Sequence, residues 1–156
     1  NTVVTRPKRD DWNVYFMKMA DFASTRATCD RKHCGTVIVK NNRVISTGYN
    51  GSDSGEPHCD DVGHFMVNNS CKRTIHAEIN AIKDAKTKME NLEGCILYTN
   101  TYPCIACFWA IMKAGIKQIY FKDEHAGYVN DQDMEKIATA FGIKIAKINT
   151  GPNTNA

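Results

Sequence analysis

"GTVIVKNNRVISTGYN", residues 35–50, sets the frame of the predicted fold. It contains two runs rich in β-branched residues, which favour extended strands. Between the runs stands Asn41-Asn42, a pair that suits a tight two-residue turn. The stretch therefore predicts an antiparallel β-hairpin, and the rest of the chain is assigned outward from it.

Helical periodicity appears before the hairpin and three times after it. The first helix is predicted over residues 11–26. The second begins near Thr74, the third begins near Pro103 and ends at Gly115, and the fourth ends at Gly142. Three short apolar runs alternate with the later helices and predict strands. The runs are CILYTN (95–100), QIYFK (118–122) and KIAKI (144–148). The buried stripe expected on the first helix consists of Trp12, Tyr15, Phe16, Met19, Phe22 and Ala23.

This order of elements predicts the class of fold. Each strand after the hairpin is separated from the next by a helix, and right-handed crossovers make such strands parallel. We therefore expect an α/β fold of three layers, α/β/α, around a five-stranded mixed sheet. Residues 1–150 are expected to form a single domain, and the polar end of the chain, residues 151–156, to be disordered. Residues 51–73 are expected to form a long loop.

Composition narrows the class of protein. The 156 residues are 42% hydrophobic and contain no run of about 18 apolar residues, so we expect no membrane span. A net charge of +3 is too small to indicate duplex nucleic acid, but it is compatible with a small phosphorylated substrate. Seven cysteines without a charged-then-apolar leader favour metal ligation or reactive thiols in a reducing cytoplasm over a disulfide framework. Because the chain begins at Asn1 and not at Met, a clipped leader remains open.

Two short motifs carry the chemistry. In TIHAEINAI (74–82), His76 and Glu78 stand two apart in a first helical turn. Alone, they could be a packed core histidine and an acid that complements the helix dipole. In PCIAC (103–107), Cys104 and Cys107 lie on one side of a helix start, where thiolates are favoured. Alone, this pair could be a thioredoxin-like redox pair, half of a zinc site or two small core residues.

Together the two motifs predict a catalytic metal centre. Both begin helices at what should be one end of the sheet, where open α/β sheets bind ligands. One histidine and two cysteines leave tetrahedral zinc with an open position, as in catalytic zinc sites. The series H-x-E…P-C-x-x-C is the signature of zinc nucleobase deaminases. We therefore predict Glu78 as the catalytic proton shuttle. The predicted ligands of the catalytic zinc are His76, Cys104 and Cys107.

From about residue 11 to residue 148, the chain resembles the deoxycytidylate (dCMP) deaminases of phages and bacteria, within the cytidine deaminase superfamily. The matching motifs are RATC (26–29), GTVIVK (35–40), STGYNG (46–51), HCDDVG (58–63), CKRTIHAEINAI (71–82), YPCIAC (102–107) and AGIKQIYF (114–121). The resemblance implies a cytidine-deaminase-like fold and hydrolysis of dCMP to dUMP and ammonia, which supplies dUMP for thymidylate synthesis. It also implies a homohexamer in the cytoplasm (of the host, if phage-encoded), activated by dCTP with Mg²⁺ and inhibited by dTTP.

The resemblance also suggests residue roles. Arg26 matches an arginine near the phosphate and Asn50 an asparagine that contacts the sugar, although Arg26 could be a helix C-terminal cation and Asn50 a turn residue. In KDEHAGY (122–128), His125 stands where many relatives have tyrosine, with Tyr128 nearby. The other residues implied in substrate binding are Ala77 and Tyr102, and those implied in effector binding are Gly48, Tyr49 and Gly51.

A second, structural zinc is also expected, because phage and bacterial dCMP deaminases often carry one in this region. Four closed ligands would fix the long loop. The expected ligands are Cys29, Cys59, His64 and Cys71, with His58 in reserve. Cys34 and Cys95 are expected to be inert residues inside strands.

Other functions compete with this prediction. A related zinc deaminase could act on another cytosine nucleotide or on another amino-bearing ring, such as a pterin, guanine or an RNA base. A zinc-stabilised binding module would show no turnover that depends on Glu78. A thiol oxidoreductase would cycle Cys104 and Cys107 in zinc-free protein and would leave Glu78 without a role.

Overall fold

The computed structural model describes six parts of the chain. They are residues 8–28, 33–51, 66–67, 70–71, 75–123 and 132–150.

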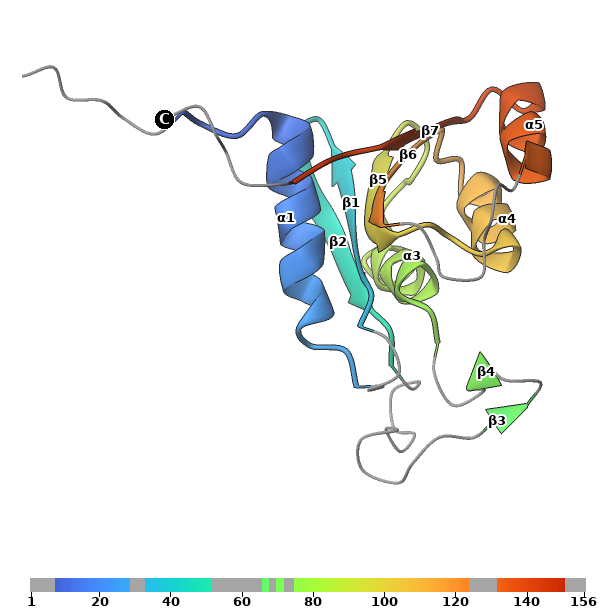
Figure 1. The fold of residues 1–156 in the computed structure, drawn as a ribbon, viewed down its shortest axis with the longest axis horizontal. Coiled ribbons are helices and arrows are strands. Elements are labelled where there is room, and N and C mark those ends of the chain that lie inside the picture. Colours follow the sequence, from blue (N-terminus) through green and yellow to red (C-terminus); the bar gives the residue numbers. More distant parts are fainter. Residues whose placement is uncertain are drawn as a thin grey trace, which may run out of the picture.

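A five-stranded mixed sheet forms the centre of the molecule, as predicted (Figure 1). Its order is β2-β1-β5-β6-β7; β1 pairs antiparallel with β2 and with β5, and β5, β6 and β7 run parallel. The strand bounds are β1 Gly35–Lys40, β2 Arg43–Tyr49, β5 Ile96–Thr101, β6 Gln118–Asp123 and β7 Lys144–Lys147.

Helices cover both faces of the sheet, so the predicted three-layer arrangement is also confirmed. Figure 1 shows α1 (Trp12–Ser24) alone on one face. The other face carries α3 (Ala77–Thr87), α4 (Ile105–Lys113) and α5 (Gln132–Ala140). Each layer boundary has its own cluster of buried apolar side chains: one contains Phe16 and Tyr98 under α1, and the other contains Leu97 and Phe108 under α3 and α4. Among the described helices, none is long and apolar enough to cross a membrane.

The expected buried stripe of α1 is only partly confirmed: Phe16 is buried and Met19 and Ala23 are half-buried, but the other three residues are exposed. Trp12 is 55% exposed and Phe22 is 78% exposed, whereas the buried residues are Phe16, Met17 and Ala20. The reason is close packing: any side chain at Gly35 in β1 would collide with the backbone carbonyl of Ala20. The helix therefore turns Ala20 to the sheet and leaves three aromatic side chains, Trp12, Tyr15 and Phe22, exposed.

The same principle sets the position of α3. Its buried face contains Ala77, Ala81 and Ala85, and Ile79 is only half-buried. A side chain at Gly48 in β2 would collide with the backbone carbonyl of Ala77. The small residues on both elements thus bring the first turn of α3 directly against the hairpin.

The hairpin turn has the predicted conformation, but the connection between β2 and α3 differs from the prediction. Asn41 and Asn42 have positive φ angles of 52° and 60°, as the predicted hairpin turn requires. Residues 51–73, expected to be a loop, instead contain the paired strands β3 (Met66–Val67) and β4 (Ser70–Cys71). Two-residue strands have no periodicity for a sequence pattern to reveal. The tail predicted to be disordered, residues 151–156, lies outside the described residues.

Candidate active site

Two helix N-termini meet at this site. His76 is the N-cap residue of α3, and Cys104 is the N-cap residue of α4. Pro103 therefore stands just before the helix cap and not within the first turn, where it was expected. A helix N-terminus favours nearby negative charge, so both helices stabilise thiolates and carboxylates here.

His76, Cys104 and Cys107 come together in space, and they are the group of possible metal ligands found among the described residues. Their ligand atoms all lie within 4.8 Å of one another. The Nδ1 atom of His76 is 3.2 Å from Sγ of Cys107 and 3.5 Å from Sγ of Cys104. Nitrogen and sulfur ligands of one tetrahedral zinc would be roughly 3.6 Å apart, given the usual bond lengths. The donor types and their spacing therefore fit a zinc ion with three protein ligands.

The two thiols of this group differ in proton affinity. The hydrogen bond with the Cys107 side chain lowers the pKa of Cys104 to about 4, with further lowering by His76 and the backbone N–H of Cys107. That N–H lies 3.4 Å from the Cys104 sulfur. The same contact with Cys104, together with burial, raises the pKa of Cys107 above its ordinary value. Cys104 is thus the first of the two to become a thiolate, the form that binds metal.

Glu78 lies beside the group as a buried carboxyl. It is 5% exposed, and its Oε1 atom accepts a hydrogen bond of 3.1 Å from the Thr99 hydroxyl. Burial raises the pKa of Glu78, against the lowering effects of its backbone N–H, the His76 charge and the Thr99 hydrogen bond. A carboxyl with a raised pKa next to a metal site is suited to accepting and returning protons. His76 is exposed and is therefore not a packed core histidine, whereas Glu78 is an acid in the first turn of α3, as that alternative had it, but a buried one.

Asn50, directly after β2, is buried and forms hydrogen bonds with two other segments of the chain. Its Oδ1 accepts a 2.7 Å hydrogen bond from the backbone N–H of Cys34, and its backbone carbonyl accepts one of 3.2 Å from Thr28. Asn50 therefore fixes the segments that follow α1 and precede β1. Arg26 is exposed in the turn that follows α1.

Tyr102 and Ala77 stand next to the predicted metal ligands in the chain. Tyr102 is half-buried, and its ring lies edge-on to that of Phe121, with centroids 4.8 Å apart. Ala77 is fully buried in the first turn of α3. The residues expected at an effector site occupy different environments: Gly48 is packed against α3, the Tyr49 carbonyl accepts from Asn80, and Gly51 forms an isolated bridge with Ile75.

Several predicted residues cannot be placed. Cys29, His58, Cys59, His64 and His125 lie outside the described residues, and of Cys71 only the backbone in β4 is described. The two remaining cysteines are only partly as expected. Cys95 is buried but precedes β5, and Cys34 is half-buried and precedes β1, so neither lies inside a strand.

The sequence analysis missed the polar end of β5. Thr99, Asn100 and Thr101 are all buried, and Asn100 accepts a 2.9 Å hydrogen bond from the backbone N–H of Gly35. Three consecutive polar residues in an otherwise apolar strand, directly before YPC, were the available signal. Buried polar groups of this kind need partners, and so they indicate a built site.

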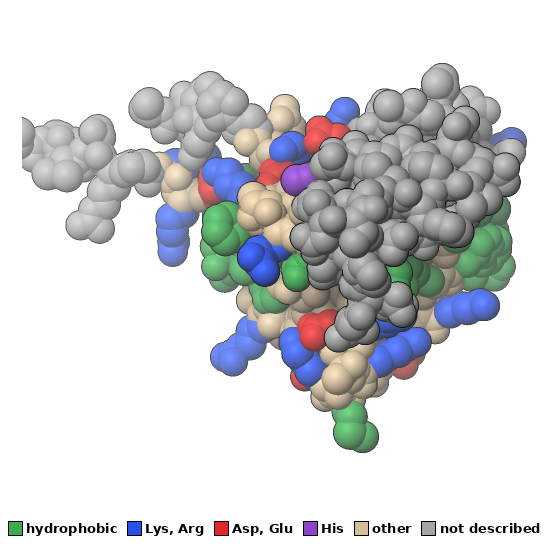
Figure 2. Space-filling model, turned by 90° about the horizontal axis from the view of Figure 1, so that it is seen from below, with side chains coloured by type: hydrophobic (Ala, Val, Ile, Leu, Met, Phe, Trp, Pro, Cys, Tyr) green, Lys and Arg blue, Asp and Glu red, His purple; other side chains and the backbone are tan. Residues whose placement is uncertain are grey.

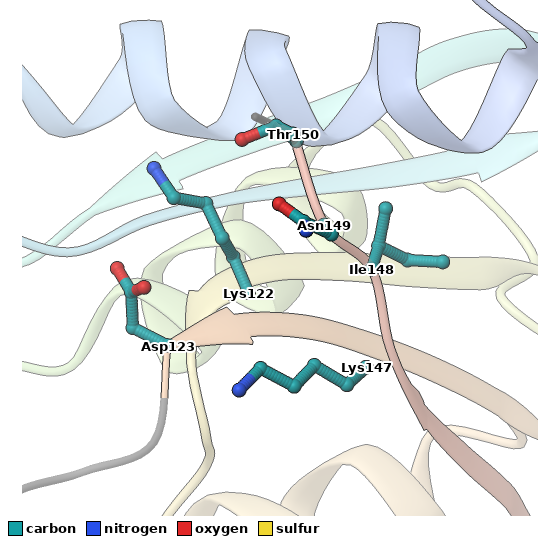
Figure 3. A pocket seen from close by; sticks show the side chains of 6 residues that line it. All are labelled: Lys122, Asp123, Lys147, Ile148, Asn149 and Thr150. Carbon is teal, nitrogen blue, oxygen red and sulfur yellow. The ribbon is translucent and has the colours of Figure 1, made fainter. Parts of the chain in front are cut away.

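A hollow of about 640 Å³ lies at the ends of β6 and β7. Figure 3 shows its lining, with Lys122, Asp123 and Lys147 as the charged members. Lys122 is paired with Asp21 of α1 at 2.8 Å, which offsets one of the two positive charges. The residues that line the hollow include no histidine or cysteine, whereas His76, Cys104 and Cys107 bring three possible metal ligands together beside the buried Glu78, so this group is the candidate active site.

Positive charge is not gathered into one patch on the described part of the face shown in Figure 2. On the face shown in Figure 2, Lys and Arg side chains are spread along the rim with Asp and Glu among them. Lys18 and Asp10 form an ion pair of 2.7 Å, and Lys88 pairs with Asp84 at 2.8 Å.

Comparison with known proteins gives consistent matches. The family described as "Cytidine and deoxycytidylate deaminase zinc-binding region" matches residues 10–123. ComE operon protein 2 of Bacillus subtilis is 39% identical over 127 residues, which cover 81% of this chain and 67% of that protein. The deoxycytidylate deaminase of Mycobacterium phage D29 is 33% identical over 127 residues, covering 74% of this chain and 98% of the phage protein.

A solved structure extends the comparison to the fold. The dCMP deaminase of cyanophage S-TIM5, in complex with dCMP and dUMP, superposes with a TM-score of 0.76 and 25% identity, over 90% of this chain and 99% of the other. The chain spans 44% and 45% of the length of the deoxycytidylate deaminases of Schizosaccharomyces pombe and Saccharomyces cerevisiae. The family match covers both helix N-termini of the site and four of the five strands of the sheet, β1, β2, β5 and β6. The chain therefore belongs to the cytidine and deoxycytidylate deaminase zinc-binding family.

Proposed function

We propose that this protein hydrolyses dCMP to dUMP and ammonia. The observation that carries the proposal is the buried Glu78 carboxyl beside three side chains whose ligand atoms lie within 4.8 Å of one another. The similarity to deoxycytidylate deaminases, one of them matched over nearly its whole length, supports dCMP as the substrate. The structure of a relative in complex with dCMP and dUMP supports the same substrate and product.

His76, Cys104 and Cys107 would hold the zinc ion. When bound, zinc would supply a water whose pKa is lowered toward about 7, and thus a nucleophile at neutral pH. The N-terminus of α4 favours the thiolate form of Cys104, whose sulfur is oriented by the N–H of Cys107, and a bound zinc ion would stabilise the Cys107 sulfur as a thiolate as well.

Glu78 moves the protons of the reaction. Its carboxylate accepts a proton from the attacking water, and the oxygen of that water forms a bond to the ring carbon that bears the amine. Glu78 then gives this proton to the neighbouring ring nitrogen. It next takes the second proton from the hydroxyl group formed on the ring carbon and passes it to the amine, which leaves as ammonia when the carbon–nitrogen bond breaks. The balance is dCMP plus water to dUMP plus ammonia, and the carboxylate is regenerated.

The remaining predictions from the resemblance belong to the same proposal. Arg26, Asn50, Ala77, Tyr102 and His125 contact the substrate. The enzyme acts as a homohexamer in a reducing cytoplasm, and dUMP supplies thymidylate synthesis. Activation by dCTP with Mg²⁺ and inhibition by dTTP operate through the GYNG segment (48–51). A second zinc is held by Cys29, Cys59, His64 and Cys71, with His58 as the alternative ligand.

A substrate panel tests the proposal. Ammonia release is measured at neutral pH from dCMP, CMP, deoxycytidine and dCTP, each alone and with added dCTP–Mg²⁺ or dTTP. We expect rapid turnover of dCMP and much slower turnover of the other three. If zinc-loaded protein turns over none of them, the dCMP assignment is wrong and other amino-bearing rings become the candidates. Effector dependence is scored separately, in the dCMP reaction.

A further inference from the structure

Thr99 lies in the middle of the sheet, directly beneath the Glu78 carboxyl. It is fully buried in β5, and its hydroxyl oxygen is 3.1 Å from Oε1 of Glu78 and 3.1 Å from the backbone carbonyl of Thr101. We propose that Thr99 is a positioning residue: its hydroxyl holds one oxygen of Glu78 and leaves the other for the reacting groups. This inference rests on the proposed function, since it assigns a role within the same reaction.

The contact between the Thr99 hydroxyl and Oε1 holds the Glu78 carboxyl in one orientation whichever form it takes. A threonine hydroxyl has one proton and can donate to one acceptor at a time. When Glu78 is a carboxylate, the hydroxyl donates to Oε1. When Glu78 holds the proton on its other oxygen, Oε1 is still an acceptor, and the hydroxyl continues to donate to it. The carboxyl thus keeps a partner in both states, which a buried group requires.

The backbone makes this contact rigid. Thr99 is paired with Thr36 of β1 on one side and with Phe121 of β6 on the other, so its strand is fixed from both edges. Glu78 is in the first turn of α3, which packs against the hairpin through Ala77 and Gly48. A proton shuttle must be held near its productive geometry, and a displacement of about 1 Å can cost about 100-fold in rate.

Thr36 provides a matched control on the neighbouring strand. It is fully buried, as Thr99 is, and it is directly paired with Thr99, so both side chains point to the same face of the sheet. Among the described residues, its hydroxyl has no hydrogen-bond partner. Replacing Thr36 by valine therefore makes the same chemical change at the same depth without breaking a contact to Glu78.

The experiment compares substitutions that differ only in the hydroxyl. Valine is isosteric with threonine, so Thr99→Val and Thr36→Val each remove only a hydroxyl. If Thr99→Val does not fold, Thr99→Ser and Thr99→Ala take its place: both lack the methyl group, and only the serine variant keeps the hydroxyl. Zinc content, the dissociation constant for dUMP, KM and kcat are measured for each, with dCMP as the substrate.

We expect Thr99→Val to lower kcat about 10- to 100-fold, with KM, dUMP binding and zinc content within about threefold of the parent. Thr99→Ser should stay within about fivefold of the parent kcat, and Thr99→Ala should match Thr99→Val. Thr36→Val should leave kcat unchanged. The inference is overturned if Thr99→Val and Thr36→Val behave alike, or if Thr99→Ser is as slow as Thr99→Ala. An inactive parent enzyme would instead contradict the proposed function.

Discussion

The Nδ1 atom of His76 lies 3.2 Å from the Sγ atom of Cys107, although 31 positions separate the two residues in the chain. This proximity arises because α3 and α4 begin at the same end of the sheet. Each helix contributes its N-cap residue, so the site is built from the two elements whose ends best stabilise negative ligands.

The first prediction concerns zinc. Cys107→Ser should lower the zinc content by about one equivalent per chain and abolish ammonia release, because a hydroxyl is a poor substitute for a thiolate ligand. The measurement is metal analysis of the purified protein. Cys95→Ala is the control, since Cys95 is equally buried but lies away from the ligand group. Equal zinc content in the two variants would contradict the ligand assignment.

The second prediction concerns the contact between β2 and α3. Gly48→Ala should destabilise the protein by about 1–3 kcal/mol, because the added methyl group would meet the Ala77 carbonyl. It should also weaken zinc binding, since Ala77 follows His76 directly. Urea unfolding and zinc affinity check both effects.

Thr47→Ala is the control for this contact, because Thr47 is the exposed neighbour in the same strand. It should change the stability by less than about 0.5 kcal/mol. If both variants unfold at the same urea concentration as the parent, the packing account of Gly48 is wrong.

The third prediction concerns the orientation of α1. Phe16→Ala should destabilise the fold by about 3–5 kcal/mol, because Phe16 is fully buried against Tyr98. Phe22→Ala should change the stability little, because Phe22 is 78% exposed. Thermal unfolding of the two variants distinguishes the observed orientation from the stripe expected from periodicity, in which both would be core residues.

The fourth prediction concerns alkaline pH. Burial raises the pKa of Tyr98 to about 12, and its hydroxyl donates to Asn13 at 2.6 Å. Because folding raises this pKa above the unfolded value near 10, the stabilisation is complete below pH 10 and is lost as the pH rises through 12. Between these values the parent should lose about 2 kcal/mol more stability than Tyr98→Phe does. Unfolding titrations across this range provide the measurement, and identical curves would contradict the prediction.

The sequence was sufficient for the fold because the hairpin, the crossovers and the helix stops are local signals. The turn at Asn41-Asn42 and the parallel order after it follow from short-range chemistry and from handedness. The face that α1 buries could not be predicted in this way. It depends on Gly35, which meets Ala20 only in three dimensions, and an aromatic stripe at helical spacing outweighs an alanine in any periodicity argument.

The sequence also predicted the main residues of the candidate site, but not all of them. His76, Cys104 and Cys107 are recognisable because metal ligands have restricted residue types and spacing. Thr99 was missed because threonine is common in strands. Only its burial and its hydrogen bond to Glu78 indicate a role in the site. A hydrogen bond between a strand and a helix 21 positions away in the chain leaves little trace in a single sequence.

The most direct test of the central claim is ammonia release from dCMP by the parent and by Glu78→Gln, at equal and measured zinc content. The substitution keeps the size of the side chain and the contact with Thr99 but removes its capacity to carry a proton. We predict a loss of about 10²–10⁴-fold in kcat with dUMP binding retained. A glutamine variant that holds zinc and deaminates dCMP at the parent rate would contradict the account.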